Sequence, residues 1–166
     1  MAIVLIGPPA SGKSRVGRRL ARALALPLID TDKVIQTAHG AIPQIFSEHG
    51  EPYFRQLERA AVVDALKADG VVSLGGGAVL DPATQADLRP HVVVMLDTTA
   101  EAVERRLANG KRPLAGSVEQ WAALVEARRP IYERLADIRI DTSSKTMDDV
   151  AEQILDWLHQ SREFSE

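Results

Sequence analysis

The sequence contains no cysteine and few aromatic residues, which make up 4% of its 166 residues. Without cysteine the chain can form neither disulfide bonds nor thiolate metal sites, which fits a reducing compartment. The apolar run near the N-terminus, Ala2–Ile6, has five residues and no basic segment before it. Such a run is too short for a signal peptide or a membrane-spanning helix. We therefore expect a cytoplasmic protein.

A strong charge of either sign is also absent, because the formal net charge is −3 at pH 7. No polyanionic partner is expected from this value, neither nucleic acid nor an acidic membrane surface. The length of 166 residues fits one domain, since domains usually have about 100–200 residues. No heptad repeat or apolar patch can be identified from the pattern, so we expect a monomer.

Short apolar runs alternate with helical patterns along the chain. Buried parallel strands consist of continuous Val, Ile and Leu runs, so this alternation predicts a five-stranded, mostly parallel sheet with helices on both faces. The expected strands are residues 2–6, 26–30, 71–74, 91–96 and 137–141. The expected helices lie near residues 13–25, 51–69, 99–109, 118–134 and 146–160. Gly70 directly follows the second of these helices and is a usual C-cap signal.

Residues 7–14, GPPASGKS, match the phosphate-binding pattern G-x-x-x-x-G-K-[ST] between a strand and a helix. Glycine lets the backbone wrap closely enough for successive N–H groups to point at phosphate oxygens. Lys13 is expected to reach the β- and γ-phosphates, and the Ser14 hydroxyl to ligate Mg²⁺. The nucleotide site is therefore predicted at Ala10, Ser11, Gly12, Lys13, Ser14 and Arg15.

A phosphate loop alone does not distinguish a kinase from a switch or a motor. The guanine-reading N-K-x-D segment of GTPase switches is absent, and motors are usually longer than this chain. Residues 109–117, NGKRPLAGS, place two cations between glycines and a proline and are typical of a mobile lid. These features favour a small-molecule kinase.

Two aspartates at strand ends are candidates for holding Mg²⁺, namely Asp30 and Asp97. Asp97 precedes Thr98 and Glu101, which have capping-box spacing, so it is interpreted as a helix-start residue. Asp30 has no such box after it and is the better metal candidate. In an extended chain Asp30 and Asp32 point to the same side, which would place both carboxylates at one strand end.

Six motifs in this order resemble those of the shikimate kinase family, and the resemblance covers nearly the whole chain. They are GPPASGKS (7–14), IDTD (29–32), FRQLE (54–58), SLGGGAV (73–79), KRPLAG (111–116) and RRPIY (128–132). The resemblance implies a single α/β/α P-loop kinase domain over residues 1–166. It also implies a helical substrate-binding part at about residues 31–60 and a lid at about residues 109–117.

The resemblance further implies that the chain phosphorylates the 3-hydroxyl of shikimate with ATP and Mg²⁺. It implies that Asp32 accepts hydrogen bonds from the shikimate hydroxyls and that Arg55 and Arg128 bind the substrate carboxylate. The Gly76 N–H would contact a ring hydroxyl. The lid residue Arg112 would cover the phosphates, and Lys145 would lie near the adenine. With Asp30 and Ser14 at the metal, the implied catalytic residues are Lys13, Asp32 and Arg112.

Several alternatives stay open at this point. Asp32 would either remove the hydroxyl proton or only orient the hydroxyl, and Asp30 would ligate Mg²⁺ directly or through water. Only the spacing of R-x-P-x-Y favours Arg128 over Arg129 as the residue that points inward. Other functions are another small-molecule kinase, such as gluconate kinase, or a non-catalytic nucleotide-binding module, which would have no need of the arginines.

Overall fold

The computed structural model describes residues 1–108 and 117–163 and contains a five-stranded parallel sheet. The strands are β1 (Ile3–Ile6), β2 (Leu28–Asp30), β3 (Val71–Ser73), β4 (Val92–Asp97) and β5 (Ile138–Asp141), in the order β2-β3-β1-β4-β5. Each neighbouring pair is parallel, so the predicted fold class is confirmed. The central strand β1 is buried along its whole length, as its uninterrupted apolar sequence requires.

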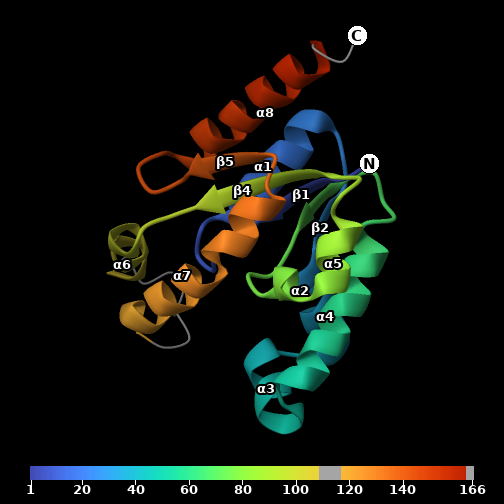
Figure 1. The fold of residues 1–166 in the computed structure, drawn as a ribbon, viewed down its shortest axis with the longest axis vertical. Helices are drawn as coiled ribbons and strands as arrows, with labels where there is room; N and C mark the ends of the chain where they lie inside the picture. The colour runs from blue at the N-terminus through green and yellow to red at the C-terminus, as the bar shows by residue number, and fades with distance from the viewer. Residues whose placement is uncertain (109–116, 164–166) are drawn as a thin grey trace.

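Helices cover both faces of the sheet (Figure 1). The helices are α1 (Lys13–Leu24), α2 (Thr31–His39), α3 (Ile42–His49), α4 (Glu51–Ala65), α5 (Pro82–Asp87), α6 (Ala100–Ala108), α7 (Val118–Leu135) and α8 (Met147–Glu163). A 3₁₀ turn, η1 (Ala78–Leu80), follows the triple glycine. The helices expected from the pattern are all present. The pattern did not predict α2, α3, α5 and η1, although the family resemblance implied a helical part at about residues 31–60.

Two hydrophobic clusters lie on opposite faces of the sheet because alternate residues of a strand point to opposite sides. Ile3 and Leu5 of β1 pack with residues of α1 and α8. Val4 and Ile6 pack on the other face, with residues of α4 and α7 and with Leu88 at the end of α5. The two helical layers thus pack on the faces of the sheet, and the loops after the strands lie at its carboxyl edge.

The expected end of the helix at 51–69 is wrong. The helix ends at Ala65, and the N–H groups of Lys67 and Ala68 donate to Asp64 and Ala65 in turns of the shorter i−3 type. Gly70 is therefore no C-cap. It is required for space, because the Pro27 carbonyl oxygen lies 2.7 Å from the position that a Cβ would take at Gly70.

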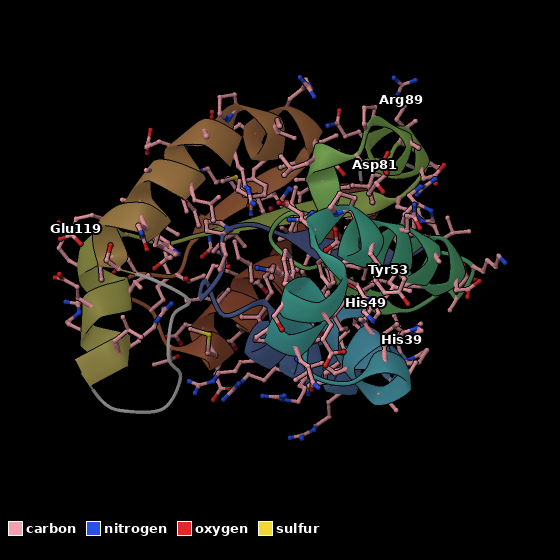
Figure 2. All side chains as sticks on the ribbon, turned by 90° about the horizontal axis from the view of Figure 1, so that it is seen from below. His39, His49, Tyr53, Asp81, Arg89 and Glu119 are labelled. Atoms are coloured by element: carbon pink, nitrogen blue, oxygen red, sulfur yellow. The ribbon has the colours of Figure 1, made fainter. Side chains whose placement is uncertain are left out.

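The helices α2, α3 and α4 form a small cluster of their own beside the β2 edge (Figure 1). Phe46 and Phe54 pack with ring centroids 4.8 Å apart, and Ile35 and Ile45 are buried beside them. At the surface, His49 and Tyr53 lie side by side at the corner between α3 and α4, with centroids 4.5 Å apart (Figure 2). Whether this part is the substrate-binding subdomain stays a prediction.

No helix in the described ranges, 1–108 and 117–163, is long and apolar enough to cross a membrane. The lid prediction falls almost wholly on residues 109–116, outside the described residues, and so does Arg112.

Two leucines on helices test where the stability of this fold originates. Leu20 of α1 is fully buried between the sheet and α8, whereas Leu124 of α7 is 39% exposed. We expect Leu20→Ala to lower the free energy of unfolding by about 2–5 kcal/mol, because it leaves a cavity. Leu124→Ala, the matched control, should change it by less than about 1 kcal/mol. Urea unfolding measures both, and equal losses would contradict the assignment of the core.

Candidate active site

The carboxyl ends of four neighbouring strands carry the predicted site residues. β1 leads into the phosphate loop (residues 7–12), β2 ends at Asp30, β3 leads to Gly75–Gly77 and β4 ends at Asp97. Because the strands are parallel, these ends meet at one edge of the sheet. In open α/β sheets this edge is where ligands bind.

Each carbonyl of the phosphate loop from residue 7 to residue 11 accepts a hydrogen bond from a side chain. The Lys13 ammonium donates to the carbonyls of Gly7, at 2.9 Å, and Pro8, at 2.8 Å. The remaining three donors are Trp121 to Pro9 (2.8 Å), Arg106 to Ala10 (2.5 Å) and Thr142 to Ser11 (2.9 Å). The side chains of distant elements thus fix the orientation of the whole loop.

The helix that follows the loop presents its N-terminus at the same place. Gly12 has φ 95°, a left-handed conformation that glycine adopts at no steric cost, and α1 begins at the next residue. The first helical hydrogen bond runs from Val16 N–H to the Gly12 carbonyl. The preceding N–H groups have no helical acceptor, and in the described part of the chain no side chain caps them. This end of α1 suits an anionic phosphate group.

Lys13 is buried, and burial lowers the pKa of its ammonium to about 8. The nearby carboxylates of Asp32 and Asp30 counteract this effect, and Arg128 adds to it. The lysine predicted to reach the phosphates therefore lies within the electrostatic field of both predicted acidic residues and one predicted substrate-binding arginine.

The position of Asp30 differs from the expected one. Asp30 caps α2, since its Oδ1 accepts hydrogen bonds from the N–H groups of Asp32 and Lys33 at 3.1 and 3.3 Å. Asp32 is already in the first turn of that helix, so the idea of two aspartates on one extended strand is wrong. The other carboxylate oxygen, Oδ2, accepts from the Ser14 hydroxyl at 2.6 Å, so the two predicted metal residues are in direct contact.

Asp32 faces the triple glycine and the middle of α4. Its Oδ1 lies 2.7 Å from the position of a Cβ at Gly75, and Glu58 Oε2 lies 3.1 Å from the same point. A side chain at Gly75 would collide with both carboxylates. Burial first, and Asp30 second, raise the pKa of Asp32, while Lys13 and Arg55 lower it in part.

Arg55 is held in this site by glutamates of its own helix. It donates to Glu58 at 2.7 Å and to Glu51 at 3.4 Å. Glu58 is buried, and burial raises the pKa of its carboxyl group against the effect of Arg55. The guanidinium nitrogens of Arg55 lie 2.6 Å from the position of a Cβ at Gly77, so a side chain at Gly77 would displace the guanidinium from this place.

Consecutive arginines on α7 point in different directions. Arg129 donates to Asp97 at 2.5 Å, whereas Arg128 influences the pKa values of Lys13, Glu58 and Tyr132. Arg128 is therefore the arginine on the side of the predicted site, as the R-x-P-x-Y register favours.

Asp97 has another role than the expected one. Its carboxylate is buried and accepts 2.5 Å hydrogen bonds from Arg129 and Arg139, which satisfy a charge that would otherwise be costly inside the protein. The hydroxyl that caps α6 belongs to Thr99, which accepts from the N–H of Ala102 at 3.2 Å. Asp97 is thus an ion-pair residue and not a helix cap.

Two predicted nucleotide residues lie at the surface. Lys145 is exposed and donates to Gln153 at 2.8 Å, and Arg15 is exposed on the first turn of α1. Arg106 was missed, although its guanidinium joins the phosphate loop to the Thr142 carbonyl. Burial, followed by repulsion from Arg15 and Arg105, lowers its pKa. A helical pattern with two adjacent arginines gave no signal that one of them reaches a loop 96 positions away.

Known proteins are similar to this chain in sequence and in fold. The family model for shikimate kinase matches residues 9–159 of the chain. The chain belongs to the shikimate kinase family. The shikimate kinase of Corynebacterium efficiens is 48% identical over 158 residues, which cover 92% of this chain and 94% of the relative.

Solved structures of family members are also similar. The shikimate kinase of Acinetobacter baumannii, solved in complex with shikimate, is 31% identical with a TM-score of 0.88, and the match covers 96% of this chain and 93% of that one. The shikimate kinase of Aquifex aeolicus is 36% identical with a TM-score of 0.81, covering 98% of both chains. The resemblance suggested by the six motifs is therefore confirmed, and with it the assignment of the chain as a kinase.

The pKa of Lys13 gives a prediction for nucleotide binding by this kinase. Phosphate groups favour the charged ammonium, so ADP affinity should fall as the pH rises through about 8. At pH 8, where about half of the free Lys13 is neutral, ADP binding should take up roughly half a proton. Calorimetry in buffers of different ionisation enthalpy measures this uptake. Lys13→Arg, which stays charged, should lose it; uptake that persists in this variant would contradict the assignment.

Proposed function

We propose that the residues brought together here transfer the γ-phosphoryl group of ATP to the 3-hydroxyl of shikimate. The observation that carries this proposal is the position of Asp32. Its carboxylate lies between Lys13 of the donor side and Arg55 with Glu58 on the acceptor side, against the bare backbone of Gly75. A hydroxyl held by Asp32 would be close to the phosphates bound by the loop.

On the acceptor side, Arg55 and Arg128 would bind the carboxylate of shikimate. A planar guanidinium donates two parallel hydrogen bonds to a carboxylate, which fixes orientation as well as adding affinity. The Gly76 carbonyl accepts a 2.6 Å hydrogen bond from the Tyr132 hydroxyl, which holds this stretch of backbone in place. The N–H group of Gly76 would then bind a ring hydroxyl of shikimate.

On the donor side, the loop N–H groups and Lys13 would bind the phosphates. Phosphoryl transfer depends mainly on positioning and on neutralising charge, and the bond to the acceptor oxygen forms as the bond to the β-phosphate oxygen breaks. Asp32, whose pKa is raised, would accept the hydrogen bond of the attacking hydroxyl. Arg112 on the lid would add positive charge at the phosphates.

Ser14 and Asp30 supply a donor set that suits Mg²⁺. Their hydroxyl and carboxylate oxygens, 2.6 Å apart, are the hard ligands that this ion prefers. Among the described residues no group of three acidic, His or Cys side chains could enclose a metal, which agrees with an ion held mainly by phosphates and water. Bound there, Mg²⁺ would neutralise phosphate charge. We propose Ser14 as the direct ligand and Asp30 as the residue that orients it.

The observed contacts argue against the alternatives. A non-catalytic nucleotide-binding module has no need for the pairing of Arg55 with the buried Glu58, or for Asp32, whose burial is unfavourable. A gluconate kinase would not be expected to combine these residues with three glycines. That the kinase acts as a cytoplasmic monomer stays a prediction from the sequence.

An ADP-release assay with shikimate, gluconate and nucleoside monophosphates tests the reaction. We expect turnover with shikimate only, and turnover with another acceptor alone would refute the proposal.

Asp32→Asn should lower kcat at least about 100-fold while ADP binding persists. Since the folded state raises the pKa of Asp32, its ionised form costs stability above that pKa, so Asp32→Asn should unfold at a higher temperature at pH 7.

Arg128 and Arg129 form a matched pair of adjacent arginines. Arg128→Gln should raise the KM for shikimate about 10- to 100-fold, because charged hydrogen bonds to the substrate are lost, with little change in the melting temperature. Arg129→Gln should instead lower the melting temperature, since the buried carboxylate of Asp97 loses one of its two partners. Steady-state kinetics and thermal unfolding separate the two outcomes. The reverse pattern would show that Arg129 binds the substrate and that Arg128 has the structural role.

A further inference from the structure

Trp121 connects a helix of the outer layer with the phosphate loop. It lies in the first turn of α7, where it is 6% exposed and packs against Val103 of α6 and Val125. Figure 2 labels Glu119 in the same turn, beside α6 and distant from α2 and α3. The indole N–H donates to the Pro9 carbonyl at 2.8 Å across 112 positions of sequence. Packing alone would not require this hydrogen bond.

The sequence of the loop makes this carbonyl important. Pro8 and Pro9 have no N–H group, so the first N–H after Gly7 is that of Ala10. In a trans peptide the carbonyl and the N–H point in opposite directions. The hydrogen bond from Trp121 to the Pro9 carbonyl therefore fixes the direction of the Ala10 N–H, on the opposite side of the same peptide.

The backbone of Ala10 also needs support from its neighbours. Its φ of 66° lies in the left-handed region, which is unfavourable for a residue with a Cβ. Such a conformation persists only where the surroundings fix it. The carbonyl before Ala10 is held by Trp121, and its own carbonyl is held by Arg106 at 2.5 Å. The two side chains fix the peptides on both sides of the strained residue.

We propose that Trp121 is a positioning residue for nucleotide binding, which aims the Ala10 N–H at a phosphate group by holding the Pro9 carbonyl. It acts through the loop and not by touching the nucleotide. The proposal rests only on phosphate binding by residues 7–14 and holds whatever the acceptor of the kinase is. The hydrogen bond is made by the indole N–H, so a phenyl ring in the same place cannot replace it.

The second tryptophan of the chain provides the control. Trp157 lies half-buried on α8, and its side chain takes no part in the site. Trp121→Phe should weaken ADP binding about 3- to 10-fold by calorimetry, the range expected for one neutral hydrogen bond. The KM for ATP should rise by a similar factor, while the KM for the phosphoryl acceptor stays within about twofold. Trp157→Phe should change neither.

Fluorescence provides a second measurement on a fully folded protein. In the Trp157→Phe variant, Trp121 is the only indole, and saturating ADP should shift its emission because its hydrogen-bond partner belongs to the loop that binds the phosphates. Unchanged emission would overturn the proposal. So would ADP affinity in Trp121→Phe equal to that of Trp157→Phe. A parallel rise in both KM values with a lower melting temperature would show a structural role only and would also overturn it.

Discussion

The parallel pairing of five strands is the constraint on which the rest of this structure depends. Because each neighbour runs in the same direction, the loops after β1, β2, β3 and β4 meet at one edge. Residues separated by up to 90 positions, from Gly7 to Asp97, thereby become neighbours without any direct sequence relation. The register, in which Ile3 pairs with both Val71 and Val92, places the phosphate loop in the middle of that edge. In the proposed function, the loop after β1 would bind the phosphates, and the groups that follow β2 and β3 would bind the acceptor beside it.

The charged side chains at this edge suit the binding of substrates but lower the stability of the free protein. Burial raises the pKa values of Asp32 and Glu58 and lowers that of Lys13, so each charged form is disfavoured where it stands. The groups lie close enough to compensate one another in part, as the 2.7 Å Arg55–Glu58 contact shows. Bound phosphates would favour the charged form of Lys13, and a bound carboxylate would pair with the arginines. The cost agrees with the general observation that functional sites reduce stability.

The long helix α7 links parts of the site that the sheet alone does not fix. Its first turn holds the phosphate loop through Trp121, Arg129 holds the buried Asp97, and Tyr132 holds the Gly76 carbonyl at 2.6 Å. Arg128 projects from the same helix toward Lys13 and Glu58. One rigid element therefore contacts both the donor side and the acceptor side, and a rotation of α7 would disturb both. Pro130, which removes a helical hydrogen bond, lies directly after the two arginines.

The sequence by itself determined the alternation of strands and helices, the phosphate loop and the family, because apolar runs and glycine patterns depend on local chemistry. It also favoured Arg128 over Arg129 through the spacing of one motif. It missed that Asp30 caps α2 and misjudged Asp97, since a carboxylate at a strand end can cap a helix or neutralise arginines, and only the partners decide. Arg139, Arg106 and Trp121 are partners of this kind, 42, 96 and 112 positions from the groups they bind. Such contacts leave no periodic signal in the sequence, because hydrogen bonds across these separations are created only when the sheet and its helices pack together.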